Sequence, residues 1–143
     1  MKTWPLLMSF AFASLPVVAQ TADWQVYQQG TALELALDRQ SVWSESDGLV
    51  HFVNQERFAN AQFDSHYKVN FSIRRTTGYA DCKRFQYVLV STDFYDANNR
   101  HVWSTLYPVP RYNWKWNPVY QDSVADAMME LVCSTPAPSK KPE

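Results

Sequence analysis

CKRFQYVLVSTDFY, residues 82–95, is rich in β-branched and aromatic residues and is long enough to form a strand that crosses a whole sheet. Its centre, Val88-Leu89-Val90, is apolar at consecutive positions, which predicts an inner strand covered on both faces. DANNR, residues 96–100, follows with Asp and Asn residues that tolerate the left-handed backbone of a hairpin. We therefore expect HVWSTLY, residues 101–107, to return antiparallel beside the first strand.

Alternating side chains before this stretch predict further strands. In YKVNFSIRR, residues 67–75, apolar and polar residues alternate with the period of two of a half-buried strand. ALELALD, residues 32–38, alternates in the same way, with its leucines on one face. WQVYQQ, residues 24–29, and LVHFVNQERF, residues 49–58, are weaker strand predictions based on β-branched and aromatic content. Together these segments predict a small antiparallel sheet of about six strands.

One helix is predicted, over DSVADAMMELVC, residues 122–133. Asp122 or Ser123 can cap its N-terminus. An apolar stripe follows at helical spacing and consists of Val124, Ala127, Met128, Leu131 and Val132. Pro108 and Pro110 precede it and predict an irregular connection from the sheet. The fold class is therefore predicted to be α+β, with the C-terminal helix packed on one face of the sheet.

The N-terminus has the pattern of a secretory signal peptide over residues 1–19. Lys2 precedes a short apolar run, and small residues precede the predicted cleavage after Ala19. No later segment has the roughly 20 apolar residues of a transmembrane helix. We expect an exported protein, in the periplasm or at the outer membrane or cell surface, with one domain over residues 20–133. The tail STPAPSKKPE, residues 134–143, has no apolar partner to bury and is predicted to be disordered.

Charge and cysteine content exclude some classes of function. The chain has 13 Lys and Arg against 14 Asp and Glu, a net charge of −1, and this balance argues against a nucleic-acid partner. The two cysteines, Cys82 and Cys133, would enter an oxidising compartment on export, so we predict that they pair. A bridge between them would tie the predicted helix to the sheet. Two cysteines are too few for a zinc site.

The sequence shows no constellation typical of catalysis. No Ser, Thr or Cys stands in a recognisable nucleophile setting. Three carboxylates, Asp93, Asp96 and Glu56, are candidates for an acid–base pair, although Asp96 fits the hairpin turn equally well. The histidines are His51, His66 and His101, and none has a helical i, i+4 histidine partner. We therefore predict a non-enzymatic protein without a metal or cofactor.

The first candidate binding segment is RYNWKWNPVYQ, residues 111–121. Tyr112, Trp114 and Trp116 alternate with polar residues, so an extended segment would place the three rings on one side. Rings that face the sheet would close the core edge, whereas rings that face water would form an interaction patch flanked by Arg111 and Lys115. For Tyr112 and Trp114 both interpretations stay open.

The second candidate is SIRRTTGYADCKR, residues 72–84. Its basic residues Arg74, Arg75, Lys83 and Arg84 would lie close together if the intervening residues form a turn. Such a cluster would be either a solvated hairpin end or a small docking site for an anionic partner.

The order of motifs resembles the surface-adhesin protein E family of Gram-negative bacteria. The resemblance rests on an early DW, the hairpin FYDANN at residues 94–99, WNPV at residues 116–119, and the helix that ends in Cys133. It implies a small antiparallel sheet with a helix laid across it, export to the periplasm or cell surface, and, for some members, adhesion to host matrix or plasma proteins. It also implies that Trp116, at a family position just before the helix, belongs to the core.

The leading hypothesis is therefore an exported adhesin-like protein that contacts host or envelope proteins through an aromatic and basic surface. The alternative is a periplasmic domain that binds a small apolar or porphyrin ligand between helix and sheet. The residues expected for that alternative are Trp103, Trp114 and Trp116, with His101. The strand at residues 24–29, if it lies at the sheet edge, can pair with its copy in a second chain and form a homodimer.

Overall fold

The computed structural model describes residues 21–139, so the predicted signal peptide lies outside the described residues. Eight strands, two short 3-10 helices and one α-helix follow in order. They are β1 (Trp24–Gln29), β2 (Leu33–Asp38), η1 (Arg39–Ser41), β3 (Trp43–Ser44), β4 (Val50–Asp64), β5 (Val69–Asp81), β6 (Gln86–Tyr95), β7 (His101–Ser104), η2 (Arg111–Asn113), β8 (Asn117–Pro118) and α1 (Val124–Ser134).

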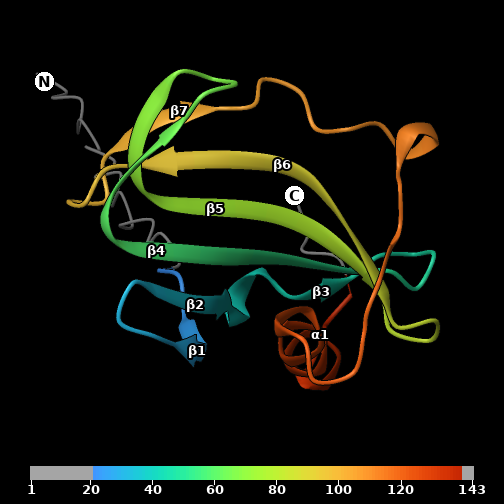
Figure 1. The fold of residues 1–143 in the computed structure, drawn as a ribbon. Coiled ribbons are helices and arrows are strands. Elements are labelled where there is room, and N and C mark those ends of the chain that lie inside the picture. The colour runs from blue at the N-terminus through green and yellow to red at the C-terminus, as the bar shows by residue number, and fades with distance from the viewer. Residues whose placement is uncertain (1–20, 140–143) are drawn as a thin grey trace, which may run out of the picture.

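The sheet is antiparallel, as predicted, but it has eight strands where we expected about six. Six strands form the path β1-β2-β4-β5-β6-β7, while β3 pairs with β4 and β8 pairs with β6. The two additional strands have two residues each, too short for an alternating pattern to reveal. In Figure 1 the long strands β4, β5 and β6 run side by side across the picture, with α1, β1 and β2 below them and β7 above.

The hairpin of β4 and β5 is longer than predicted and forms the centre of the sheet. Its strands have 15 and 13 residues, and their register shifts between Arg57 and Gln62. The turn that joins them is ordered by Asp64, whose carboxylate accepts from the N–H groups of His66 and Tyr67, both at 2.9 Å.

The stretch from Cys82 to Tyr95 begins as a turn. The Asp81 carboxylate accepts from the N–H groups of Lys83 and Arg84, both at 3.1 Å, and the strand itself starts at Gln86. Val88 and Val90 are buried, but Leu89 is 42% exposed. The prediction that this centre is covered on both faces is therefore wrong, because α1 lies mainly against β1, β2, β4 and β5.

The hairpin after β6 has the predicted form. Asn99 has a φ of 63°, and the Asp96 carboxylate accepts from the N–H groups of Asn98 and Arg100, both at 2.9 Å. β7 then returns antiparallel but ends at Ser104, before the predicted end at residue 107.

Helix α1 begins and packs much as its sequence indicates. Ser123 is the cap, and its Oγ accepts from the N–H of Asp126 at 3.1 Å. The buried residues of the helix are Met128, Met129 and Val132, which pack on residues of the sheet that include Leu37 and Phe52. Two residues differ from the predicted stripe, since Val124 is 46% exposed and Met129 is fully buried.

The predicted disulfide is confirmed. Cys82 and Cys133 are bonded, with a Cα–Cα distance of 5.7 Å. Cys82 lies in the β5–β6 turn just before β6, and Cys133 lies in the last turn of α1. The bond therefore ties the helix to one end of the central strands.

Part of the tail expected to be disordered is instead ordered. The helix extends to Ser134, and residues 135–139 run beside β3, where the N–H of Ser44 donates to Pro138 O at 2.7 Å. Ala137 packs against the core, so this short segment does find an apolar contact. None of the helices in the described part of the chain is long and apolar enough to cross a membrane.

Candidate binding surface

The segment between β7 and α1 runs beside β6 for most of the length of that strand. β7 pairs with the last residues of β6 and β8 with its first two. Between them, the N–H groups of Thr105 and Val109 donate to β6 carbonyls at 3.0 and 2.8 Å. Pro108 and Pro110 cannot donate, and the ladder is interrupted around them. We call residues 105–116 the strap; it is the orange segment that stands off β6 in Figure 1.

Trp114 returns from the strap onto the sheet. Its ring stacks on Tyr79 of β5, with ring centroids 4.9 Å apart and planes at 26°, and its Nε1–H donates to Val109 O at 2.8 Å. Trp116 meets Trp114 edge to face at 5.8 Å. Both tryptophans are half-buried. Such aromatic pairs contribute about 0.5–1.5 kcal/mol each beyond their burial, so they hold the strap against the sheet.

The stack continues across the sheet on the face opposite α1. His51 precedes Phe52, which packs in the helix-covered core, so its ring lies on the other face. Trp43 stacks on His51 with centroids 3.6 Å apart, and His51 meets Tyr79 edge to face at 5.5 Å. We call Trp43, His51, Tyr79 and Trp114 the aromatic row. Sequence reasoning missed this row because its members come from four separate segments.

His51 is the buried member of this row. One of its ring nitrogens, Nδ1, lies 2.6 Å from Ser41 O. In the neutral tautomer that carries its proton on Nδ1, this nitrogen donates to that carbonyl. Burial lowers the pKa of His51, because desolvation penalises the charged imidazolium. The ring therefore acts as a neutral aromatic spacer rather than as a surface charge.

Arg111 covers the outer side of Trp114. Its guanidinium carbon lies 4.9 Å from the Trp114 ring centroid and 5.9 Å from that of Tyr79. Its Nη1 forms an ion pair with Asp47, in the turn between β3 and β4. The hydrogen bond from Arg111 holds the pKa of the Asp47 carboxyl below its ordinary value. The ion pair thus fastens the strap to a turn 64 residues away in sequence.

The three rings of this segment do not share one side. Arg111–Asn113 forms the turn η2 instead of an extended strand, and this turn directs Tyr112 outward, where it is 87% exposed. Lys115 is also exposed. Of the residues predicted for this surface, Arg111, Tyr112, Trp114 and Lys115 therefore lie together on the strap, with Trp114 turned inward.

The four basic residues predicted to cluster are separated. The prediction required a turn after Arg75, but residues 69–81 are continuous strand. Arg74 and Arg75 lie on opposite faces of mid-strand β5, whereas Lys83 and Arg84 lie in the turn at its end. Arg84 pairs with Asp81 at 3.1 Å.

Arg75 has its own network on the face opposite α1. Its Nε donates to Gln55 Oε1 at 2.9 Å, and its guanidinium carbon lies 5.0 Å from the Trp24 ring centroid and 4.2 Å from that of Tyr95. Arg75 also donates to Asn99. These contacts join β1 to the β6–β7 hairpin. The guanidinium of Arg75 therefore has partners inside the protein and does not form a basic surface patch with Lys83 and Arg84.

The three carboxylates considered for catalysis are also engaged separately. Glu56 pairs with Arg74, Asp93 accepts from Ser104, and Asp96 orders its hairpin turn. Within residues 21–139, no three His, Cys, Asp or Glu side chains are grouped closely enough to hold a metal ion.

The residues expected for a ligand between helix and sheet do not meet there. Trp103 stacks on Tyr67 with centroids 4.2 Å apart, in an aromatic cluster at the β4–β5 hairpin, while Trp114 lies on the face opposite α1. His101 contacts Ser104.

A groove does lie between α1 and the sheet, with a volume of about 290 Å³. It is lined by residues that include Leu35, Leu89 and Met128 and contains none of those predicted residues. The Tyr27 hydroxyl on its wall donates to Asn54 Oδ1 at 2.6 Å, and burial raises the pKa of Tyr27, which keeps it protonated.

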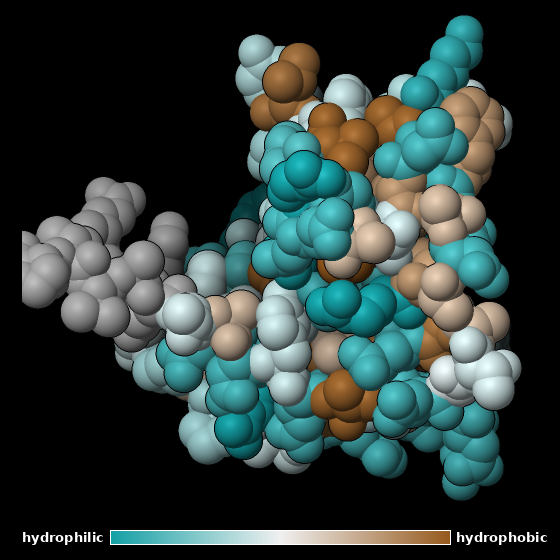
Figure 2. Space-filling model, turned by 90° about the vertical axis from the view of Figure 1, so that its left-hand side faces the viewer, coloured by the Kyte–Doolittle hydropathy of each residue, from teal (hydrophilic) through white to brown (hydrophobic). Residues whose placement is uncertain are grey.

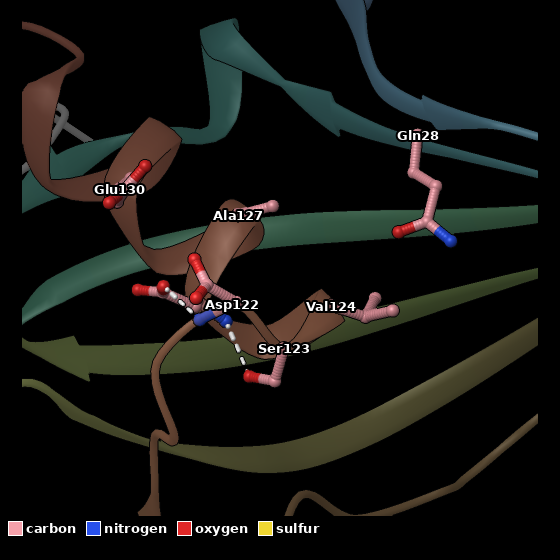
Figure 3. A pocket seen from close by; sticks show the side chains of 7 residues that line it. Gln28, Asp122, Ser123, Val124, Ala127 and Glu130 are labelled. Carbon is pink, nitrogen blue, oxygen red and sulfur yellow. Dashed lines mark hydrogen bonds between the residues drawn. The ribbon is translucent and has the colours of Figure 1, made fainter.

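An acidic hollow of about 450 Å³ lies at the start of α1 (Figure 3). Asp122, Asp126 and Glu130 line it together with Gln28. The Asp126 carboxylate accepts from the N–H of Asp122 at 2.8 Å, while its own N–H donates to Ser123 Oγ. The polar groups of Ser123 and Asp126 in this hollow therefore serve to begin the helix.

Comparison with known proteins finds one matching family and solved structures of similar fold. The sequence profile of the family described as Surface-adhesin protein E matches residues 24–134. The structure of Haemophilus influenzae protein E is 18% identical, over 70% of this chain and 76% of that one, with a TM-score of 0.50. The crystal structure of protein E from non-typeable Haemophilus influenzae is 14% identical, over 83% and 80%, with a TM-score of 0.54. No curated protein sequence matches the chain.

The structural likenesses concern the fold alone at these identities. The family profile, by contrast, covers nearly all of the described residues and includes both cysteines of the disulfide. The chain therefore belongs to the surface-adhesin protein E family.

Proposed function

We propose that this protein is an exported, non-enzymatic, adhesin-like protein that contacts a host or envelope protein through its strap. Family membership supports an adhesin-like surface protein. The observation that carries the proposed site is the exposed Tyr112 between Arg111 and Lys115, on a backbone held against the sheet by Trp114. The predicted signal peptide supports export to the periplasm or the cell surface.

The strap has the chemical character of a protein-binding element. Tyr and Arg are enriched among the residues that dominate binding energy at protein interfaces. Tyr112 can bury a large ring with little loss of rotamer freedom, because the turn that carries it is already fixed by the Arg111–Asp47 ion pair and by the hydrogen bond from Asn113 N to Pro110 O at 2.9 Å. A partner would therefore meet a preformed surface.

The experiment is binding of the exported chain to a panel of extracellular-matrix, plasma and envelope proteins, measured by biolayer interferometry. We expect one or more of them to bind, and Tyr112→Ala to weaken that binding roughly tenfold or more. Lys115→Ala is expected to reduce the association rate and its dependence on salt, since it removes a rim charge.

The matched control is Tyr120→Ala, which removes another exposed tyrosine, 72% exposed, at the start of α1. Equal loss in Tyr112→Ala and Tyr120→Ala would show that the strap is not the site. No binding to any member of the panel would count against adhesion itself. The same chain run on a sizing column tests whether β1, at the sheet edge, pairs with its copy to form the predicted homodimer.

A further inference from the structure

Most of the exposed large hydrophobic residues in the described part of the chain come from three neighbouring segments, the β4–β5 hairpin, β7 and the strap. Leu106 and Tyr107 on the strap are each 85% exposed, and Phe63 at the β4–β5 hairpin is 60% exposed. We call the following set the apolar side: Phe63, Val102, Leu106, Tyr107, Val109 and Tyr112. These residues come from the hairpin, β7 and the strap, which lie along the upper edge in Figure 1.

Two further observations support this arrangement. Tyr67 of the hairpin stacks on Trp103 of β7, so hairpin and β7 are in contact. Figure 2 shows several hydrophobic residues at the top of the molecule, mixed with hydrophilic ones, above a surface that is mostly hydrophilic. The projecting residues are therefore spread along an edge of the molecule, which fits an extended planar surface better than a compact pocket.

The charges on this side favour a surface with anionic groups. In the segments 60–69 and 100–116, Asp64 is the single carboxylate and Lys68, Arg100, Arg111 and Lys115 are basic, although Arg100 pairs with Asp96 and Arg111 with Asp47. Asp64 is occupied by the turn that it orders. Lys68 and Lys115 form no salt bridge within the described part of the chain and stay available at the rim.

Residues 108–110 of the strap have no free backbone N–H group that would have to leave water. Pro108 and Pro110 have no N–H, and the N–H groups of Val109, Asn113 and Trp114 already donate within the protein. Fewer free donors mean a smaller desolvation cost when the strap approaches an apolar phase.

From these observations we infer that the apolar side rests on a lipid surface, with Leu106, Tyr107 and Phe63 entering the boundary between headgroups and acyl chains. Leu and Tyr side chains partition to this boundary, and nearby Lys residues attract anionic headgroups. The inference adds a second contact to the proposed protein-binding role and does not depend on it.

The test uses the chain without its predicted leader and vesicles of phosphatidylethanolamine with phosphatidylglycerol. We expect the protein to sediment with these vesicles, and less with vesicles of phosphatidylethanolamine and phosphatidylcholine alone. The double variant Leu106→Ser/Tyr107→Ser should weaken sedimentation roughly tenfold or more, because it removes two apolar anchors. The double variant Val26→Ser/Tyr120→Ser, on β1 and at the start of α1, removes similar exposed groups elsewhere and should bind like the wild type.

A spectroscopic measurement tests whether the apolar side is the side of the protein that contacts the vesicle. The emission that Tyr107→Trp adds to that of the native tryptophans, obtained as the difference from the wild type, should shift to shorter wavelength when vesicles are added, while that added by Tyr120→Trp should not. Wild-type protein that stays in the supernatant, or two double variants that bind equally, would overturn the inference. Capture by an immobilised host protein without any vesicle binding would also overturn it and leave the proposed adhesive function standing.

Discussion

Helix α1 and the strap cover opposite faces of the same sheet in different ways. The helix buries Met128, Met129 and Val132 against aliphatic and aromatic residues and is bonded to the β5–β6 turn by a disulfide. The strap covers its face with stacked rings, one ion pair and a few hydrogen bonds, and it leaves Leu106 and Tyr112 in solvent.

This difference indicates that the helix side provides most of the stability of the fold, whereas the strap provides contact area for a partner. Burial of apolar area, with cross-linking of the chain, contributes most of the stability of a small domain. Exposed rings on an anchored loop contribute little to folding, but they supply contact area to a partner. We therefore expect variants on the helix side to unfold the protein and variants on the strap to leave it folded.

The largest effect should come from the disulfide. Replacing both Cys82 and Cys133 by Ser opens a loop with a sequence separation of 51, for which the chain-entropy model gives a loss of about 4 kcal/mol in the free energy of unfolding. Urea unfolding followed by circular dichroism measures the loss. Two free thiols in the native wild type, or an unchanged urea midpoint in the variant, would contradict it.

The next effect should come from the helix core. Met129 is fully buried, so Met129→Ala should lower the free energy of unfolding by about 3 kcal/mol, through lost burial and a residual cavity. Val124→Ala, on the same helix at a position that is 46% exposed, is the control and should cost less than about 1 kcal/mol. Similar losses in the two variants would mean that the helix sits differently on the sheet.

Met129 and Val124 also show which structural features a sequence pattern does not predict. Alternation, together with β-branched and aromatic content, located six of the eight strands, and the Asp and Asn residues of DANNR located a hairpin whose Asn99 has the required positive φ. Helical spacing found the helix, and of the two predicted caps, Asp122 and Ser123, the structure uses Ser123. The spacing could not decide that Met129, rather than Val124, faces the core, because that depends on how far the helix reaches over the sheet.

The candidate site was less predictable for the same reason. Arg111, Tyr112, Trp114 and Lys115 are neighbours in sequence, so their grouping could be read directly. The residues that hold them in place are Asp47, His51 and Tyr79. These are distant in sequence and come close only when the sheet has folded. The basic cluster depended on a turn between Arg75 and Lys83, and it does not form because residues 76–81 continue the strand β5.

On the strap, Trp114→Ala should have a smaller effect than Met129→Ala. It removes the stack on Tyr79 and the contact with Trp116, which predicts a loss of about 1–2 kcal/mol in the free energy of unfolding. Limited proteolysis should then cut residues 105–116 faster, since the segment opens without global unfolding. Tyr112→Ala, which removes a ring that is 87% exposed, is the control and should change neither quantity appreciably. A loss as large as that of Met129→Ala would make the strap part of the main core.

The smallest effect should come from the ion pair between Asp47 and Arg111. Both side chains are partly exposed, so Asp47→Asn should cost at most about 1 kcal/mol, and less at high salt. The pKa of Asp47 is lower in the folded protein than its ordinary value of about 3.9, so the unfolded chain binds the proton more readily. The contribution is thus complete above that ordinary value and is lost as the pH falls through the lower folded pKa. Unfolding measured between neutral pH and acid should therefore show wild type and Asp47→Asn converging in acid. Curves that stay parallel would mean that the carboxylate, although it contacts Arg111, does not stabilise the strap.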